Sequence, residues 1–321
     1  MTTVAGVDIG SNTLRLVIAR VDRAERLSLV DAARQMTRLG DGMGREAVLR
    51  PAAIDRSMSV LREFRRRIAI HAPDVITVVA TSAVREAANR TEFIERVRSE
   101  TGMIVEVLSG QEEARRTLLG AWWGLRNAGL RGLSSCLLFD IGGGSTEYVL
   151  GRDVAVEGWA STPLGVVRLT ERFLHHDPVL AGELKQLRAY IDVELDQATD
   201  QIGPLPSECH VAGTAGTVTT IGALFRGLDR YDPAVVNGTR LSTAVVDEWV
   251  EMFIGMTAAR RQEVSVLKGG RAELIIAGGV VLQSSLRRWR LDGLHVSDWG
   301  LKEGIILDAV RRRGTSESLH A

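Results

Sequence analysis

The chain has 321 residues, 45% of them hydrophobic and 25% charged, which is typical of a soluble globular protein large enough for two domains. Lys+Arg and Asp+Glu both number 40, so the whole molecule has no net attraction for a polyanion, and an anion site must be a local concentration of donors. No apolar stretch approaches the length of a membrane span, and no Walker-type GxxxxGK[ST], HExxH or metal-binding cysteine cluster is present. The sequence therefore argues against membrane proteins, P-loop NTPases and zinc proteins.

The two cysteines, Cys136 and Cys209, lie in apolar runs that are typical of strands. This placement predicts buried free thiols and a reducing, cytoplasmic location. Residues 1–20 carry Asp8, Arg15 and Arg20 within a strand–turn–strand pattern, so we expect no signal peptide.

The first part of the chain predicts a mixed series of strands and helices. Pro51 suits the first turn of a helix that shows helical periodicity up to His71. In chain order we expect strands over 4–8, 14–21 and 26–37, a helix over 51–71, a strand over 74–80, short helices from 82 and 91, a strand over 103–108 and a long helix from 109.

At Cys136 the pattern of strand, glycine turn and strand begins again, with a third strand over 154–160. Helices are then expected over 163–174, 181–202, 214–225, 243–256 and 271–289. We expect the last helix to run from Leu301 to Arg312 and to be followed by a frayed tail from Gly314. This C-terminal helix, within about residues 301–321, is expected to pack back on the N-terminal lobe.

The start of the chain aligns with the segment around residue 140. Asp8-Ile-Gly and Asp140-Ile-Gly each follow a strand and precede a turn and a second strand, at an offset of 140 − 8 = 132 residues. Two such matches predict a duplicated domain. The expected fold is α/β, with an N-terminal lobe over 1–132, a C-terminal lobe over 133–300 and a cleft between them.

The glycine turns have the residue types of an anion site. A turn without side chains lets backbone N–H groups approach an anion closely, and hydroxyl groups add donors. The second turn would supply Gly142, Gly143, Gly144, Ser145 and Thr146, and the first would supply Gly10, Ser11, Asn12 and Thr13. Asp8, Asp140 and Glu147 could hold Mg²⁺. Tight hairpins without a ligand would explain either turn alone.

Ser109-Gly-Gln-Glu-Glu113 is the third element of interest. Ser109 and Glu112 have the spacing of a capping box, which explains Glu112 by helix initiation. Glu113 either complements the helix dipole or acts as a general base that orients and deprotonates a water.

Seven stretches together resemble one family. VDIGSNTLRLVIA, ATSAVREAANR, VLSGQEEA, DIGGGSTEYVLG, PLGVVRLTERF, VAGTAGTVTTIGAL and VSDWGLKEGI occur in this order between residue 4 and about residue 310. They resemble the exopolyphosphatase and guanosine pentaphosphate phosphohydrolase (Ppx/GppA) family in its short, two-domain form. The resemblance implies a two-lobed actin-like ATPase (ribonuclease H-like) fold. It also implies release of terminal phosphate from inorganic polyphosphate or pppGpp, and leaves a homodimer open.

The resemblance also assigns roles to residues of this chain. Glu113 falls at the catalytic base, and Asp140 and Glu147 fall at metal-linked carboxylates that would hold Mg²⁺ or Mn²⁺. Arg85 matches an arginine expected to face phosphate, and Gly213 and Thr214 match a phosphate-side turn of the second lobe. The longer members have a C-terminal helical region that this chain lacks, which puts processive action on long polyphosphate in doubt.

Three other functions stay open. A sensor would bind ppGpp, pppGpp or ATP with the same turns and hydrolyse it slowly. A kinase or chaperone-like ATPase of the same fold could use Ala277-Gly-Gly279 and the following helix to line a nucleoside pocket. Nucleic-acid binding could use the basic clusters at 65–67, 287–290 and 311–313, but neutral overall charge and their predicted helical setting favour solvated faces, so no nucleic-acid partner is expected.

Overall fold

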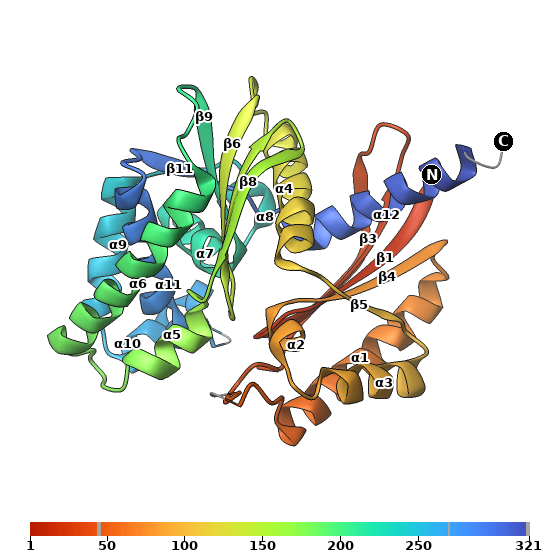
Figure 1. The fold of residues 1–321 in the computed structure, drawn as a ribbon, viewed down its shortest axis with the longest axis horizontal. Coiled ribbons are helices and arrows are strands. Elements are labelled where there is room, and N and C mark those ends of the chain that lie inside the picture. The colour runs from red at the N-terminus through yellow and green to blue at the C-terminus, as the bar shows by residue number, and fades with distance from the viewer. Residues whose placement is uncertain (44–45, 269, 319–321) are drawn as a thin grey trace. The chain divides into compact units, whose positions relative to one another are not determined.

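The computed structural model describes residues 1–43, 46–268 and 270–318, with side chains described up to residue 313. The chain divides into two compact units: unit 1 comprises residues 1–120 and 301–321, and unit 2 comprises residues 121–300 (Figure 1). Within the described ranges, no helix is both long and apolar enough to cross a membrane.

Unit 1 is built on a five-stranded sheet with the order β3-β2-β1-β4-β5. Strands β1, β2 and β3 are antiparallel neighbours, whereas β4 and β5 join parallel to β1. Its elements are β1 (Thr2–Ile9), β2 (Thr13–Val21), β3 (Leu27–Met36), α1 (Pro51–His71), β4 (Val75–Ala80), α2 (Ser82–Glu86), α3 (Arg90–Thr101), β5 (Val105–Val107) and α12 (Leu301–Ser318).

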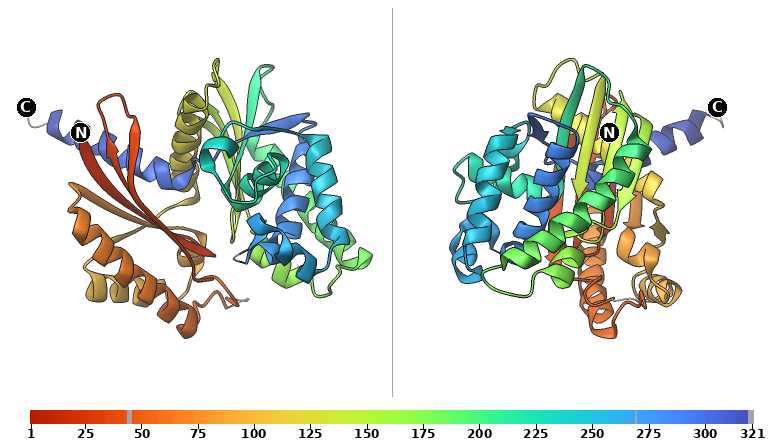
Figure 2. Two further views of the ribbon diagram at one scale, coloured as in Figure 1. Left: turned by 180° about the vertical axis from the view of Figure 1, so that it is seen from behind. Right: turned by 60° about the vertical axis from the view of Figure 1, so that its left-hand side comes forward.

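The sheet of unit 1 is covered on both faces. Because side chains alternate along a strand, Val78 joins the core made with α1 and α3, whereas Val79 packs on the other face with Ile305 of α12. Helix α12 packs against β1, as the left view of Figure 2 shows. A Cβ at Gly304 would lie 1.8 Å from the Arg116 carbonyl oxygen, so this glycine permits the close approach of α12 to the start of α4 (Gly110–Asn127).

Unit 2 contains a six-stranded sheet with the order β10-β11-β9-β6-β7-β8. Its main core packs the sheet against helices that include α6, α9 and α11. Its elements, after the end of α4, are β6 (Ser135–Ile141), β7 (Thr146–Arg152), β8 (Ala155–Thr162), α5 (Val166–Phe173), α6 (Ala181–Ile202), β9 (Cys209–Thr214), α7 (Ala215–Phe225), α8 (Pro233–Val236), β10 (Arg240–Ser242), α9 (Thr243–Gly255), α10 (Ala258–Glu263), the 3₁₀ turn Ser265–Leu267, α11 (Arg271–Arg288) and β11 (Gly293–Val296).

The two sheets repeat one topology. Strands β8-β7-β6-β9-β11 follow the same order and the same antiparallel and parallel senses as β3-β2-β1-β4-β5. The pairing of β2 with β3 shifts register between Ile18 and Ala19, and that of β7 with β8 shifts between Leu150 and Gly151. The difference 150 − 18 is again 132, so the duplication extends to the position of a β-bulge.

Most predicted elements are present, with several differences. The predicted end of the last helix at residue 312 is wrong, because α12 continues to Ser318, and residues 319–321 of the predicted tail lie outside the described part of the chain. The expected strand over 103–108 is shorter, since β5 covers only Val105–Val107. The sequence analysis did not predict β10, β11, α8 or α10. Cys136 and Cys209 are free thiols, the first buried and the second partly exposed.

Candidate active site

The turn between β1 and β2 is anchored through its carbonyl groups. Ser11 O accepts a hydrogen bond from Gly40 N at 2.8 Å, and Asn12 O accepts from Thr37 N at 3.1 Å. In a planar trans peptide the N–H points away from the carbonyl, so the N–H of Asn12, which shares its peptide with Ser11 O, points away from Gly40. Gly10 is needed here because a Cβ would lie 2.9 Å from Thr13 O.

Helix α2 connects this turn to Glu113. Its first residue, Ser82, lies with its hydroxyl oxygen 2.9 Å from that of Ser11, and both residues are buried. One turn later, Arg85 Nη1 donates to Glu113 Oε2 at 2.7 Å and to Leu108 O at 3.1 Å. Residues three apart on a helix share a face, so α2 presents the hydroxyl and the guanidinium together.

Glu113 is buried, with 6% of its surface exposed, in the first turn of α4. The helix begins as the sequence predicts, because Glu112 N donates to Ser109 Oγ at 3.2 Å. The Glu112 carboxylate, in contrast, pairs with Arg115 at 3.2 Å. The two adjacent glutamates therefore differ: Glu112 belongs to a surface cluster of charges, and Glu113 points to α2.

Asp8 at the end of β1 is 3% exposed. Its Oδ2 pairs with Arg15 Nη1 at 3.0 Å, across the β1–β2 register, whereas its buried Oδ1 has no hydrogen-bond partner. Burial raises the pKa of the Asp8 carboxyl, and the charges of Arg15 and Lys302 oppose this rise. A buried carboxylate oxygen without a partner is a position that a cation or a water would satisfy.

The turn between β6 and β7 in unit 2 is held in a similar way. Gly142 N donates to Ser145 O at 3.0 Å, while Val166 N and Val167 N donate to the carbonyls of Gly142 and Gly143, both at 3.0 Å. By the same peptide geometry, the N–H groups of Gly143 and Gly144 point away from α5. Two adjacent N–H groups aimed in this way are suited to bind an anion.

Gly165 allows this anchoring. A Cβ at residue 165 would lie 2.1 Å from the carbonyl carbon of Gly144, so only glycine lets the two backbones meet without displacement. The turn of unit 2 therefore depends on a direct backbone–backbone contact.

The hydroxyl groups of this turn have different environments. Thr146 is fully buried, and its hydroxyl donates to Leu164 O at 2.8 Å, so its single proton is not directed at a ligand in this structure. Ser145 is buried with 6% of its surface exposed. The Thr214 hydroxyl likewise donates to Trp299 O, at 3.2 Å. Thr214 would therefore contact a ligand through its backbone, at the start of α7.

Asp140 and Glu147 lie directly opposite each other on β6 and β7, and Asp140 is also in register with Thr214 on β9. Glu147 is 1% exposed and accepts a hydrogen bond from Ser161 Oγ at 2.9 Å. Two carboxylates opposite each other repel, and a cation relieves that repulsion.

These residues fit a magnesium ion. No group of three or more His, Cys, Asp or Glu residues is arranged to hold a metal within the described ranges. Mg²⁺ is usually bound through one or two carboxylates together with water and phosphate oxygens, so the Asp140–Glu147 pair is sufficient. The unpartnered Oδ1 of Asp8 adds a ligand of the same chemistry in unit 1.

The residues predicted for the site thus form two groups. Asp8, Gly10, Ser11, Asn12, Thr13, Arg85 and Glu113 lie in unit 1, and Asp140, Gly142, Gly143, Gly144, Ser145, Thr146, Glu147, Gly213 and Thr214 lie in unit 2. The sequence analysis did not single out Ser82, Gly40 or Gly165. Ser82 and Gly165 stand in the motifs ATSAVREAANR and PLGVVRLTERF, but their contacts depend on the fold.

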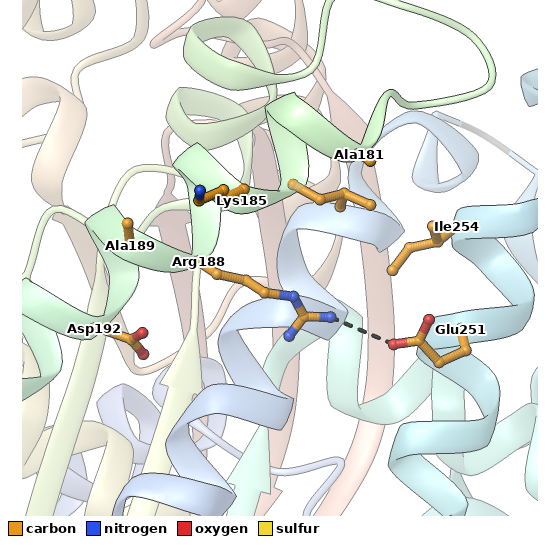
Figure 3. A pocket seen from close by; sticks show the side chains of 8 residues that line it. Ala181, Lys185, Arg188, Ala189, Asp192, Glu251 and Ile254 are labelled. Atoms are coloured by element: carbon orange, nitrogen blue, oxygen red, sulfur yellow. Dashed lines mark hydrogen bonds and ion pairs between the residues drawn. The ribbon is translucent and has the colours of Figure 1, made fainter.

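A separate groove of about 520 Å³ lies between α6 and α9 (Figure 3). The charged side chains that line the groove are two bases, Lys185 and Arg188, and two acids, Asp192 and Glu251. Arg188 already contacts Glu251 at 3.4 Å and donates to the buried Gln283 at 2.5 Å. The groove contains none of the predicted site residues and has no excess of positive charge for a phosphate chain.

The basic clusters are largely paired with acids. Arg66 contacts Glu63 at 2.6 Å, and Arg287 contacts Asp247 at 3.0 Å. Further pairs join Arg67 to Asp31, Arg288 to Asp196, Arg311 to Glu25 and Arg312 to Asp308. Such pairing favours the interpretation of these clusters as solvated protein faces.

Comparisons with known proteins agree on one family. The model of the Ppx/GppA phosphatase family matches residues 17–313. The chain is 34% identical over 319 residues to "Exopolyphosphatase 2" of Mycobacterium tuberculosis, covering 96% of this chain and 98% of the relative.

Solved structures give the same result. The Ppx/GppA family member of Aquifex aeolicus superposes with a TM-score of 0.83 at 32% identity, covering 97% of this chain and 98% of that one. A crystal structure of an exopolyphosphatase-like protein superposes with a TM-score of 0.89 at 35% identity, covering 97% and 98%. The fold is α/β, of the two-lobed actin-like ATPase type, as the sequence predicts. The chain belongs to the Ppx/GppA phosphatase family.

Proposed function

We propose that this protein is a metal-dependent phosphoanhydride hydrolase that releases the terminal phosphate of inorganic polyphosphate, with pppGpp as a second substrate. Relatives named exopolyphosphatases, at 34% and 30% identity over more than nine-tenths of the chain, support the polyphosphate activity. Each unit contributes a backbone turn whose N–H groups are suited to bind phosphate.

The observation that carries the proposal is the double contact of α2 within unit 1. Ser82 contacts Ser11 in the phosphate turn, and Arg85 contacts Glu113. A phosphoryl group at the Asn12 N–H and the Ser11 hydroxyl would therefore lie in the same unit as the base, and Arg85 would add a charge-assisted hydrogen bond to it.

Phosphoanhydride hydrolysis needs neutralised phosphate charge, an in-line water and a stabilised leaving group. Glu113 would orient the water and accept its proton as the water oxygen attacks the terminal phosphorus. The proton ends on the Glu113 carboxylate, and the shortened phosphate chain leaves with the negative charge of the broken P–O bond. Backbone N–H donors, such as those that Gly143 and Gly144 present, would stabilise such a charge.

Asp140 and Glu147, with Asp8, would hold Mg²⁺ or Mn²⁺. When bound, the ion would neutralise phosphate charge and orient the substrate. In its absence the protein would retain the backbone donors but lose most of its ability to offset the charge of the substrate.

The test is the substitution Glu113→Gln, with Glu112→Gln as the matched control in the same helical turn. Gln keeps the shape of Glu113 but cannot accept a proton, so we expect kcat for phosphate release to fall by about 10²–10⁴ while KM changes little. Glu112→Gln should retain kcat within about threefold, since its carboxylate contacts Arg115 and lies away from Arg85. Full turnover by pure Glu113→Gln protein would show that this base assignment is wrong.

The substrate is tested by initial rates of phosphate release from short polyphosphate, long polyphosphate, pppGpp and ATP, with and without Mg²⁺. The proposal expects short polyphosphate to be hydrolysed in Mg²⁺. Tight binding of a guanosine polyphosphate with no phosphate release under single-turnover conditions would instead support the alternative function, a slow or non-catalytic sensor.

A further inference from the structure

The hydroxyl pair formed by Ser11 and Ser82 joins two segments separated by 71 residues. Ser11 is 8% exposed and Ser82 is 3% exposed, and their oxygens are 2.9 Å apart. The segments are also joined through backbone, because Thr81 N donates to Ile9 O at 3.2 Å. The pair therefore sits at a fixed junction between the β1–β2 turn and α2.

Two hydroxyl groups in contact have two protons, and only one of these is used between them. If Ser82 donates to Ser11 Oγ, the Ser11 proton is available to an external acceptor. If Ser11 donates to Ser82 Oγ, the Ser82 proton is available instead. In either case the donor that faces an anion is itself polarised by the second hydroxyl, and such chains of hydrogen bonds strengthen one another.

The rest of the turn decides which arrangement an anion favours. The Asn12 N–H points away from Gly40, next to Ser11, so an anion at this N–H lies beside the Ser11 hydroxyl. The Ser11 proton would then go to the anion, and Ser82 would supply the proton that Ser11 Oγ accepts.

We propose that Ser82 is a positioning residue for phosphate binding, whose hydroxyl donates to Ser11 Oγ and thereby directs the Ser11 proton to the bound phosphoryl group. This inference rests on the proposed function for the identity of the ligand, a phosphate or short polyphosphate. It adds Ser82 to the site and gives the contact between α2 and the turn a role in binding as well as in packing.

The packing around the pair supports a fixed geometry. A Cβ at Gly40 would lie 3.3 Å from Ser11 Cβ and 3.4 Å from Ala83 Cβ, so residues on both sides of the pair are in close contact with the same glycine. Together with the hydrogen bond from Thr81 N to Ile9 O, this packing favours a hydroxyl of Ser82 that stays within hydrogen-bonding distance of Ser11.

The experiment is a double-mutant cycle on binding. Ser11→Ala, Ser82→Ala and the double variant, each in a Glu113→Gln background that suppresses hydrolysis, are titrated in Mg²⁺ with tripolyphosphate by calorimetry, and with inorganic phosphate as a second probe. Ser57→Ala is the matched control, because Ser57 is equally buried but its hydroxyl donates to Ala53 O within its own helix.

Each single variant at the pair should bind tripolyphosphate about 3–10-fold more weakly, which corresponds to one lost hydrogen bond. The double variant should be no weaker than Ser11→Ala within about twofold, because Ser82 acts through Ser11. Ser82→Thr keeps the hydroxyl and should restore binding, and Ser57→Ala should bind like the wild type.

Wild-type affinity in Ser82→Ala, or losses that simply multiply in the double variant, would overturn the inference. So would Ser82→Thr binding as weakly as Ser82→Ala. Binding without hydrolysis by the wild type would refute only the proposed function, whereas a wild-type protein that binds neither probe would refute both.

Discussion

The turn in unit 1 and the turn in unit 2 share one backbone design but differ in their chemistry. In both, a glycine after Asp-Ile donates its N–H to the residue three positions later, Gly10 to Thr13 at 3.2 Å and Gly142 to Ser145 at 3.0 Å. Opposite Asp8 stands Arg15, with which it forms an ion pair, whereas opposite Asp140 stands a second acid, Glu147.

This difference indicates that the two duplicated turns have acquired different chemical roles. The turn of unit 1 has its aspartate paired with a base of the protein itself, and adds hydroxyl groups and Glu113 nearby. The turn of unit 2 has glycine backbone donors and two facing carboxylates, a combination that favours a bound cation.

The largest effect concerns the anchoring glycines, Gly165 in unit 2 and Gly40 in unit 1. Gly165→Ala places a Cβ 2.1 Å from the backbone of Gly144, so the turn must move, and a shift of about 1 Å at a binding group typically costs about 100-fold in rate. In Gly40→Ala the new Cβ lies no closer than 3.3 Å to any neighbour, with the backbone oxygen of Ser11 at 3.6 Å, so this variant should cost less than about tenfold. Steady-state kcat/KM and thermal unfolding measure both.

Gly182→Ala is the control for these variants, because a Cβ at Gly182 meets nothing within 4 Å and the residue lies in α6. It should keep full activity. Equal losses in Gly165→Ala and Gly40→Ala would contradict the view that the backbones approach more closely at Gly165 than at Gly40.

The second prediction concerns the facing carboxylates. Asp140→Asn removes one of two acids, so the Mg²⁺ concentration for half-maximal activity should rise at least about tenfold. In EDTA the same variant should be as stable as the wild type or more stable, by about 0.2–1 kcal/mol, because a like-charge pair has been removed. Urea unfolding with and without Mg²⁺ measures the second effect independently of activity.

Asp153→Asn is the control, since Asp153 is an exposed acid in the next turn and its positive φ of 54° is tolerated by asparagine. It should change neither the Mg²⁺ requirement nor the stability in EDTA. An Asp140→Asn variant activated by the same Mg²⁺ concentration as the wild type would argue against a metal at this turn.

The smallest effect is a pH dependence outside the site, at the start of α6. The Glu183 carboxylate accepts hydrogen bonds from His176 at 2.9 Å, from His175 N at 2.8 Å and from Leu180 N at 3.0 Å. The His176 hydrogen bond is the main cause that lowers the pKa of Glu183 from 4.5 to about 2. Because the folded pKa is depressed, the stabilisation is present above pH 4.5 and is lost as pH falls toward 2.

Glu183→Gln should therefore lower the thermal midpoint at pH 6, and the difference from the wild type should shrink as pH falls from 4.5 toward 2. The position is remote from the turns in sequence, so kcat should be unchanged. A difference between the two proteins that stays constant over this pH range would show that Glu183 acts only through its shape.

Much of this arrangement could be predicted from the sequence. The helices from Pro51 and from Ala181 have the predicted ends, His71 and Ile202, because apolar periodicity, a proline in the first turn and a following glycine or proline define them locally. The offset of 132 residues between the two Asp-Ile-Gly turns predicted a duplicated domain, and the two sheets have the repeated topology. The matching β-bulges were not predicted.

Other features depend on contacts that the sequence does not specify. Strands β10 and β11 are short and are defined by pairing with partners far along the chain, such as Leu241 with Leu294. The contact of Ser82 with Ser11 spans 71 residues, and that of Gly165 with Gly144 depends on where α5 begins. The hydroxyl groups of Thr146 and Thr214 donate to carbonyl groups of the protein itself. The sequence could not show this, because the two carbonyl groups belong to other segments of the chain.

Helix α12 has a consequence for the synthesis of the protein. The strands of unit 1 are made first, yet the face of the sheet that holds Val79 is covered by Ile305, and Gly6 lies against Ile305 and Ile306. A ribosome must therefore reach residues 305 and 306 before the strands of unit 1 can bury that face, whereas unit 2 is complete in sequence by residue 300. Unit 1, whose strands are synthesised before unit 2, is thus the unit that completes its packing later.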